Sequence, residues 1–275
     1  MLVSSVDLQT EVLIVGGGPT GLVLSIELGR WGISCVLVDD KPTTSSHPQA
    51  NANSARTMEH YRRLGFADEV RQMGIPADYP TDVAYFTDFS GFELARFEQP
   101  SPGQAFAISR ARQYLRSWYT PELPHRGSQL FLEPILRKHA EMLSSVDVRF
   151  GWRFRTLEQN AETVVASIEE LATGKELKIK ADFVVGCDGP RSSVRKTIDL
   201  DYVGQGEANR AFLGGRMYAL YFRAPTFYER ISRKRAWQYW SLLPDRRAVM
   251  VAIDGRETFS GSIQLQPNAD IAPEE

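Results

Sequence analysis

The sequence predicts an α/β protein in which a Rossmann-like nucleotide-binding domain is combined with an antiparallel β-sheet domain. Three observations carry this prediction. A strand–helix–strand pattern with a glycine-rich turn opens the chain at residues 11–39, and a second buried strand leads into a polar turn at residues 181–195. Aromatic, strand-like segments with no amphipathic helix between them then occupy residues 217–253.

The first element expected is a buried strand over residues 11–15, which the turn Gly16-Gly17-Gly18-Pro19-Thr20-Gly21 closes. A buried helix over residues 22–31 should follow and end at Gly32, because glycine readily adopts the conformation that terminates a helix. The apolar run at residues 34–38 then forms a second strand. These pieces make the start of a nucleotide-binding fold.

The glycines of this turn meet three separate demands of dinucleotide binding. Gly16 suits the tight turn, Gly18 the close approach of backbone to a pyrophosphate, and Gly21 the close packing of helix on strand. Asp39 ends the second strand, where a carboxylate can accept hydrogen bonds from an adenosine ribose. An acid there favours an unphosphorylated ribose, as in FAD or NAD. The alternative is a glycine-rich turn that binds no ligand.

Three further helices are expected in the middle of the chain. One starts near Asn53 or Ser54 and stops at Gly65, and a shorter one over residues 67–73 stops at Gly74. Another follows Glu133-Pro134, because proline is preferred in the first turn of a helix.

Strands fill most of the remaining chain. A β-hairpin is expected over residues 82–97, turning at Ser90-Gly91. Further strands are expected over residues 146–154, 163–171 and 176–180.

The second motif begins with the buried strand at residues 181–186. It opens into Cys187-Asp188-Gly189-Pro190-Arg191-Ser192-Ser193-Val194-Arg195, which places Asp188 at the carboxyl end of a sheet strand, where ligands of open α/β sheets bind. The alternative is a simple turn that the Asp188 side chain caps.

Composition narrows the choice of partners and compartment. A net charge of -2 gives no general attraction to nucleic acid, and no apolar run is long enough to suggest a membrane span. Cys35 and Cys187 lie in apolar runs and are expected to be reduced, and the four histidines lack metal-ligand spacing. The first ten residues lack the features of a signal peptide, so the expected compartment is the cytoplasm.

Together with Asn53-Ser54-Ala55-Arg56-Thr57-Met58-Glu59 and Gln129, the two motifs resemble those of the FAD-dependent aromatic hydroxylases. These are single-component flavoprotein monooxygenases that include phenol and p-hydroxybenzoate hydroxylases. The resemblance runs from about Val12 to about Phe259. Its most specific part is the strand followed by Gly-Cys-Asp-Gly-x-x-Ser-x-x-Arg, because many dinucleotide-binding proteins share the glycine turn.

The resemblance implies FAD as cofactor and NADPH or NADH as electron donor. It places the adenosine diphosphate half of FAD at the first motif, and it places Gln129 and Asp188 near the cofactor. Arg56 is explained equally well by an approach to the flavin or its phosphates and by an ion pair with Glu59 on its own helix. The implied cofactor-binding residues are Gly16, Gly18, Pro19, Gly21, Asp39, Arg56, Gln129 and Asp188.

The reaction implied is hydroxylation of a phenol-like aromatic substrate by O2, through a flavin hydroperoxide. No catalytic acid or base is identified. Asn51 stands where some phenol hydroxylases carry an acid or histidine, and an amide cannot serve as a base near neutral pH. Gln49 stands where many relatives carry a basic residue.

The sequence also departs from the family. It contains no Gly-Asp dipeptide, whereas the family has such a motif after the substrate-domain sheet to hold FAD, so the chain is expected to be truncated at its C-terminus. It would then be a fragment, a chain that a complementing chain or a homodimer completes, or a degenerate homologue. The alternatives to the hydroxylase are a noncatalytic FAD-binding subunit and another flavoenzyme, such as a halogenase or reductase.

The predicted domain division interleaves the two folds. Residues 1–80 and 104–200 form the FAD-binding domain, residues 81–103 contribute a hairpin to the substrate domain, and residues 201–275 form its incomplete sheet. The basic run Arg230–Arg235 is expected to be a solvated loop rather than a docking site for an acidic partner. The aromatic side chains of the sheet are expected to be core rather than pocket lining; they are Tyr218, Tyr221, Phe222, Trp237, Tyr239 and Trp240.

Overall fold

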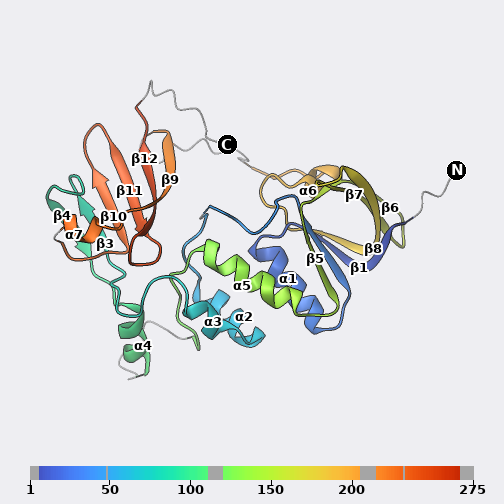
Figure 1. Ribbon diagram of the computed structural model, residues 1–275, viewed down its shortest axis with the longest axis horizontal. Helices are drawn as coiled ribbons and strands as arrows, with labels where there is room; N and C mark the ends of the chain where they lie inside the picture. Colours follow the sequence, from blue (N-terminus) through green and yellow to red (C-terminus); the bar gives the residue numbers. More distant parts are fainter. Residues whose placement is uncertain (1–5, 48, 111–119, 205–214, 232, 267–275) are drawn as a thin grey trace. The chain divides into compact units, whose positions relative to one another are not determined.

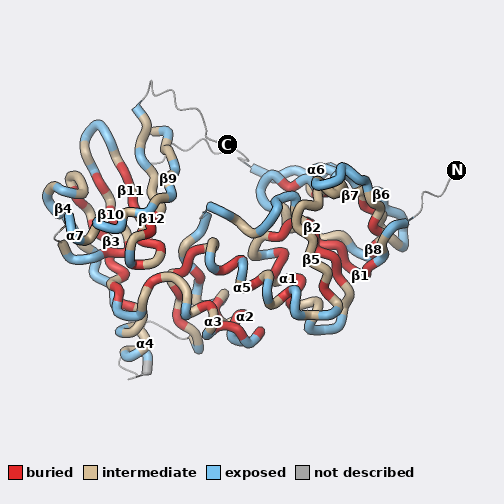
Figure 2. The backbone as a smooth tube through the Cα atoms, in the orientation of Figure 1, coloured by how far each residue is buried: buried red, intermediate tan, exposed pale blue. Residues whose placement is uncertain are grey.

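The computed structural model describes residues 6–47, 49–110, 120–204, 215–231 and 233–266. The chain divides into two compact units, one of Met1–Ser46 with Gln129–Glu207 and one of His47–Ser128 with Ala208–Glu275 (Figure 1). Buried residues follow the central strands of the sheet in each unit (Figure 2). Among the described residues, no helix has both the length and the apolar character needed to cross a bilayer.

The first unit is built on a six-stranded mixed sheet of order β5-β2-β1-β8-β7-β6. The first four strands of this order run parallel, whereas β7 and β6 pair antiparallel with their neighbours. The strands are β1 (Leu8–Val15), β2 (Cys35–Asp39), β5 (Val146–Phe150), β6 (Trp152–Gln159), β7 (Val164–Glu170) and β8 (Lys175–Gly186). The helices are α1 (Pro19–Arg30), α5 (Gln129–Glu141) and α6 (Ser193–Thr197).

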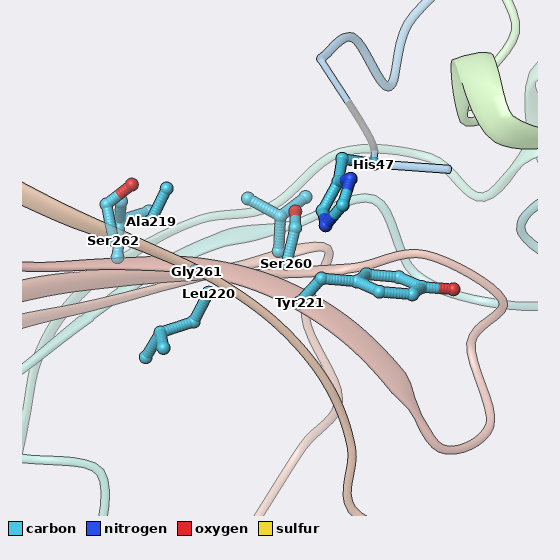
Figure 3. A pocket seen from close by; sticks show the side chains of 9 residues that line it. His47, Ala219, Leu220, Tyr221, Ser260, Gly261 and Ser262 are labelled. Atoms are coloured by element: carbon cyan, nitrogen blue, oxygen red, sulfur yellow. The ribbon is translucent and has the colours of Figure 1, made fainter. Parts of the chain in front are cut away.

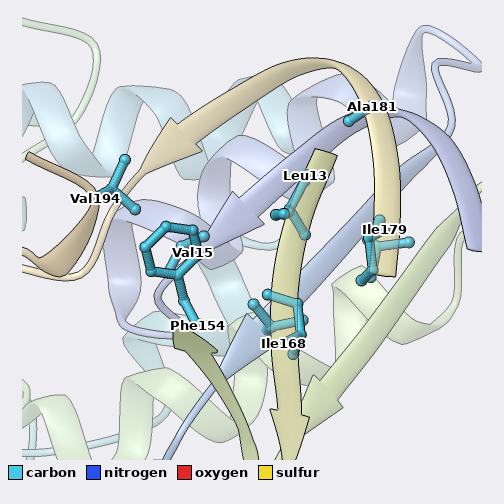
Figure 4. Close-up of a cluster of buried hydrophobic side chains, with 10 residues drawn as sticks. Leu13, Val15, Phe154, Ile168, Ile179, Ala181 and Val194 are labelled. Atoms are coloured by element: carbon cyan, nitrogen blue, oxygen red, sulfur yellow. The ribbon is translucent and has the colours of Figure 1, made fainter. Parts of the chain in front are cut away.

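The second half of β1, Val12–Val15, is buried on both faces, which explains why this part of the strand is a continuous apolar run. Leu13 and Val15 belong to a core that β6, β7 and β8 complete with Phe154, Ile168 and Ile179 (Figure 4). Ile14, between them, is fully buried as well. This packing fixes the carboxyl end of β1, from which the glycine turn starts.

The second unit contains a six-stranded sheet of order β4-β3-β10-β11-β12-β9, in which only the described pair β3 and β10 runs parallel. Its strands are β3 (Val83–Phe86), β4 (Glu93–Phe97), β9 (Met217–Arg223), β10 (Gln238–Leu242), β11 (Arg247–Ala252) and β12 (Thr258–Gln264). Its helices are α2 (Ala55–Leu64), α3 (Ala67–Arg71), α4 (Pro102–Arg110) and α7 (Phe227–Arg230).

Several sequence predictions are confirmed. Ser54 caps α2, since its hydroxyl accepts a hydrogen bond from the Thr57 N–H at 3.1 Å, and Gly65 ends the helix with a φ of +93°. The hairpin around Ser90-Gly91 is β3 and β4.

Other predictions need correction. Helix α5 begins at Gln129 rather than at Glu133-Pro134, and Pro134 lies inside the helix. The expected strand 146–154 is divided at Gly151, whose positive φ of +77° turns the chain between β5 and β6. The expected strands 176–180 and 181–186 are one continuous strand, β8, and strand β12 was not predicted.

The two compact units divide the chain differently from the predicted domains. Residues 47–80 and 104–128 group with the aromatic sheet. The isolated bridge Asn53–His125 and the Arg71–Glu122 ion pair at 2.6 Å join the two segments, and Tyr79 packs in the buried cluster of the sheet. The functional boundaries 1–80, 81–103, 104–200 and 201–275 remain a prediction.

Candidate functional site

The glycine turn after β1 contains two positions that no larger residue can occupy without displacement. A methyl group added at Gly16, whose φ is +114°, would lie 2.3 Å from the Cys187 carbonyl oxygen. One added at Gly21 would lie 1.9 Å from the Gly16 carbonyl oxygen. These two glycines therefore allow the turn to pack against the second motif and against the first turn of α1.

Gly18 is different, because a methyl group added there would meet nothing within 4 Å among the described residues. It is the N-cap of α1 and carries no side chain to cap the first turn, and Pro19 follows it at the start of the helix. Backbone N–H groups at an uncapped helix N-terminus, with the positive end of the helix dipole behind them, favour a phosphate group. The residues present thus fit a pyrophosphate.

Asp39 lies at the carboxyl end of β2, next to this turn, as predicted. Its Oδ2 accepts a hydrogen bond from the Gly17 N–H at 2.6 Å, and its Oδ1 accepts one from the Lys41 N–H at 2.9 Å. The carboxylate therefore fixes the glycine turn, and each oxygen keeps a second lone pair with which it can accept a further bond.

Asp188 caps the turn that follows β8, which is the alternative that the sequence left open. Its Oδ1 accepts a hydrogen bond from the Ser192 hydroxyl at 2.5 Å, and its Oδ2 accepts from the N–H groups of Ser193 at 2.6 Å and Val194 at 3.3 Å. The Cys187 N–H donates to the Val15 carbonyl oxygen at 2.6 Å. The two motifs therefore lie side by side at the carboxyl ends of the neighbouring parallel strands β1 and β8.

Gln129 begins α5 and is held by a carboxylate that sequence reasoning missed. Its amide nitrogen donates to Glu133 Oε1 at 2.5 Å, and Glu133 Oε2 accepts from the Ser45 N–H at 2.6 Å. Glu133 is only 1% exposed. The four-residue spacing of Gln129 and Glu133, which places both on one helix face, could be recognised in the sequence, whereas the burial of Glu133 could not.

Arg56 lies on α2 in the other compact unit and is 80% exposed in its side chain. Its guanidinium forms an ion pair with Glu59 at 2.6 Å, which is one of the two roles that the sequence allowed. A role of Arg56 at the cofactor remains a prediction.

The two thiols lack the environment of reactive cysteines. Burial raises the pKa of Cys35 to about 11 and also raises the pKa of Cys187, so both are neutral near pH 7. Across the described ranges, no three histidine, cysteine or carboxylate side chains gather as metal ligands would.

The aromatic sheet of the second unit has two different faces. Tyr239 and Phe222 pack into a buried cluster with Phe259, as the sequence predicted for these side chains. In this cluster the Tyr79 hydroxyl lies 2.6 Å from the Tyr228 hydroxyl, and burial raises the pKa of both phenols. Tyr221 points the other way and lines a pocket, and Trp240, which pairs with Val249 of that pocket, lies on the same face, so the prediction that these two side chains are core is wrong.

This pocket lies on the open face of β9, β11 and β12 and has a volume of about 200 Å³. Val249 and Val251 form an apolar floor, and Ser260 and Ser262 add hydroxyls. His47 lies over this face, on the same side as Ser260 (Figure 3). The lining residues are His47, Ala219, Leu220, Tyr221, Val249, Val251, Ser260, Gly261 and Ser262.

The basic run Arg230–Arg235 has internal partners and is more than a solvated loop. Lys234 forms an ion pair with Glu98 at 2.5 Å, Arg235 lies over the Tyr228 ring at 4.5 Å, and Arg233 bonds the Gly91 carbonyl oxygen. The run therefore anchors the β3–β4 hairpin.

Comparisons with known proteins agree with this geometry. The chain is 30% identical to an FAD-dependent monooxygenase of Emericella nidulans over 70% of its own length and 31% of that protein. It is 33% identical to phenol 2-monooxygenase of a Pseudomonas species over 69% of its length and 30% of that protein.

Among solved structures, the flavin-dependent monooxygenase PieE in complex with FAD and substrate superposes with a TM-score of 0.83. At 26% identity, it covers 98% of this chain, which in turn covers 45% of PieE. The chain thus matches only 30% to 45% of the length of these relatives. Residues 9–274 match the FAD binding domain family, and the chain therefore belongs to that family.

Proposed function

We propose that this chain forms the FAD-binding part of an FAD- and NAD(P)H-dependent monooxygenase that hydroxylates a phenol-like aromatic substrate. The observation that carries the proposal is the open, uncapped N-terminus of α1 at Gly18, beside the Asp39 carboxylate. A polyanion and a neighbouring sugar are the groups that this pair of features would bind.

The chain's own residues would hold the cofactor in stated ways. The first-turn amides after Gly18 and Pro19 would bind the pyrophosphate, and Asp39 would accept hydrogen bonds from the ribose with its remaining lone pairs. Asp188 would shape the neighbouring turn through its bonds to Ser192 and Ser193. Gln129 and Arg56 are proposed as further contacts.

The overall reaction converts an aromatic C–H to C–OH. One oxygen atom of O2 enters the ring and the other leaves as water, while NAD(P)H supplies a hydride, which carries two electrons, and becomes NAD(P)⁺; one proton from solvent completes the water. Bound FAD would supply the redox chemistry, and the protein would position the ring and exclude water.

The pocket on the second sheet is the proposed substrate site. Its floor of Val249 and Val251 suits an aromatic ring, and the Ser260 hydroxyl and the His47 imidazole can hydrogen-bond a phenolic hydroxyl. We propose binding and orienting roles for these side chains and assign no catalytic acid or base.

Purification of the chain tests the proposal directly. A yellow protein whose NADPH oxidation and product formation rise with added phenol supports it. A yellow protein that yields no hydroxylated product under any supply of NADPH, NADH and phenols contradicts the enzyme and favours the second candidate, an FAD-binding subunit. That second candidate would act as a homodimer or with a complementing chain. A colourless protein that fails to bind added FAD contradicts both.

A further inference from the structure

We propose that the substrate site continues beyond the pocket onto an aromatic strip, formed by Trp240, Tyr85 and Phe97, and therefore takes a fused polycyclic phenol rather than a single ring. This inference rests on the proposed function and deepens it, because it names the substrate class of the same site. The strip lies on β10, β3 and β4, the three strands that continue the sheet beyond the pocket.

Strand register places the strip and the pocket on one face. Trp240 pairs directly with Val249, and Tyr85 pairs directly with Trp240, and directly paired residues of neighbouring strands point to the same side of a sheet. Because Val249 lines the pocket, the pocket floor and the first two rings of the strip share the open face.

Phe97 reaches the same face along the neighbouring row. It pairs with Val83, Val83 pairs with Gln238, and Gln238 pairs with Val251 of the pocket floor. Neighbouring strands lie about 4.8 Å apart, so the strip extends the floor by roughly 14 Å across three strands.

The ring of Tyr85 contacts the rings of both Trp240 and Phe97, so the strip forms a continuous aromatic surface. The centroids of Tyr85 and Trp240 lie 5.9 Å apart in a stacked arrangement, and those of Tyr85 and Phe97 lie 5.9 Å apart edge to face. The Trp240 indole N–H donates to Gln238 Oε1 at 3.1 Å, which orients the indole. Phe97 remains 61% exposed, so apolar surface is available at the far end of the strip.

The pocket and the strip suit different parts of one ligand. The pocket, with its hydroxyls and imidazole, can bind the ring that carries a phenolic hydroxyl, and the aromatic faces of the strip can cover the rings fused to it. A single-ring phenol would not contact the strip, so the strip would contribute nothing to its binding free energy. The continuity of the two surfaces therefore favours a polycyclic phenol as the occupant of both.

The test compares two ligands that each carry one hydroxyl group, phenol and a hydroxyphenanthrene. Their dissociation constants are measured by equilibrium dialysis for the wild-type chain and for Phe97→Ala, Trp240→Ala and the control Phe92→Ala. Phe92 is 81% exposed in the turn of the same hairpin and lies outside the two rows described above.

We expect Phe97→Ala and Trp240→Ala each to weaken hydroxyphenanthrene binding about twofold to tenfold, the equivalent of 0.5–1.5 kcal/mol for an aromatic contact. Phenol binding and the Phe92→Ala control should not change. Phenol should also displace hydroxyphenanthrene, because the two share the pocket. Should Trp240→Ala fail to fold, Phe97→Ala decides alone, since it removes a largely exposed ring.

Equal losses for both ligands, or no loss for hydroxyphenanthrene, would overturn the extension while leaving the phenol site intact. Loss of self-association in Phe97→Ala, without any effect on hydroxyphenanthrene, would assign the strip to a contact between copies of the chain and also overturn it. If neither ligand binds the wild-type chain, the proposed substrate site fails together with its extension.

Discussion

The Asp39 carboxylate accepts a hydrogen bond from the Gly17 N–H at 2.6 Å, which joins the end of β2 to the middle of the glycine turn. The same side chain is the one that the sequence assigns to the ribose of the cofactor. A residue that both fixes the turn and binds the sugar should affect stability and affinity together.

Replacing Asp39 with Ala should lower the free energy of unfolding by about 1–3 kcal/mol, because it removes hydrogen bonds to a charged group. It should also weaken FAD binding at least tenfold. Urea unfolding and FAD titration measure the two effects. Asp40→Ala is the matched control, since Asp40 is more exposed and its ion pair with Arg153 is long, at 3.7 Å. Equal effects of the two substitutions would remove Asp39 from the site.

Alanine substitutions at Gly18 and Gly21 should separate ligand binding from folding. Gly18→Ala should change the free energy of unfolding by less than about 1 kcal/mol, because its methyl group enters open space. It should nevertheless weaken FAD binding at least tenfold, since the methyl group stands where the pyrophosphate must approach.

Gly21→Ala should act in the opposite way. Its methyl group would lie 1.9 Å from the Gly16 carbonyl oxygen, so the turn must move at a cost of about 1–3 kcal/mol. Thermal unfolding without FAD measures this cost.

A Gly18→Ala protein that retains FAD as tightly as the wild type would show that the phosphate lies elsewhere.

Asp188→Ala should destabilise the turn before α6 by about 0.5–2 kcal/mol, the usual loss when a capping side chain is removed. Hydrogen exchange should show faster exchange at the Ser193 and Val194 amides. Asp182→Ala, in the exposed part of β8, serves as the control. Unchanged protection at both amides in Asp188→Ala would contradict the capping role.

Local patterns predicted the first βαβ unit well, because each of its elements is short and is specified by neighbouring residues. The apolar run of β1, the glycine turn and the acid at the end of β2 can all be read within about 30 residues, a span typical of the βαβ fingerprint. What local patterns could not give is the Gly17–Asp39 hydrogen bond, which depends on how the two strands pair.

Elements whose signal lies in tertiary contacts were missed. Strand β12 buries Phe259, but Gly261 interrupts the alternation of side chains expected of a strand. Its strand conformation depends on pairing with β9 and β11, which the local sequence does not show. The start of α5 was misplaced because Pro134 suggested a first turn, whereas the buried Glu133 holds Gln129 four residues earlier in the chain. The pocket residues likewise come from segments far apart in sequence.

His125 should make the stability of the chain depend on pH between about 5 and 7. It is buried, and burial lowers its pKa below the ordinary value of 6.5. Its Nε2 lies 2.8 Å from the Met73 carbonyl oxygen, to which the neutral ring donates. Arg71 adds a nearby positive charge that further opposes protonation.

The sign follows from proton linkage. Well above pH 6.5 neither state binds the proton, so the contribution of the neutral ring is present in full. As the pH falls through 6.5, the unfolded chain binds a proton that the folded chain does not bind, because the pKa of the buried ring is lower. Stability therefore decreases until the pH reaches the lowered pKa of the folded state. The slope can reach about 1.4 kcal/mol per pH unit.

Urea unfolding at intervals from pH 7.5 to 5 measures this slope, in a range above the titration of most carboxylates. His125→Gln should flatten the curve because it removes the titrating group, and the exposed His60→Gln should leave it as steep as in the wild type. A His125→Gln protein with the wild-type slope would show that the pH dependence of stability arises from a group other than the buried imidazole.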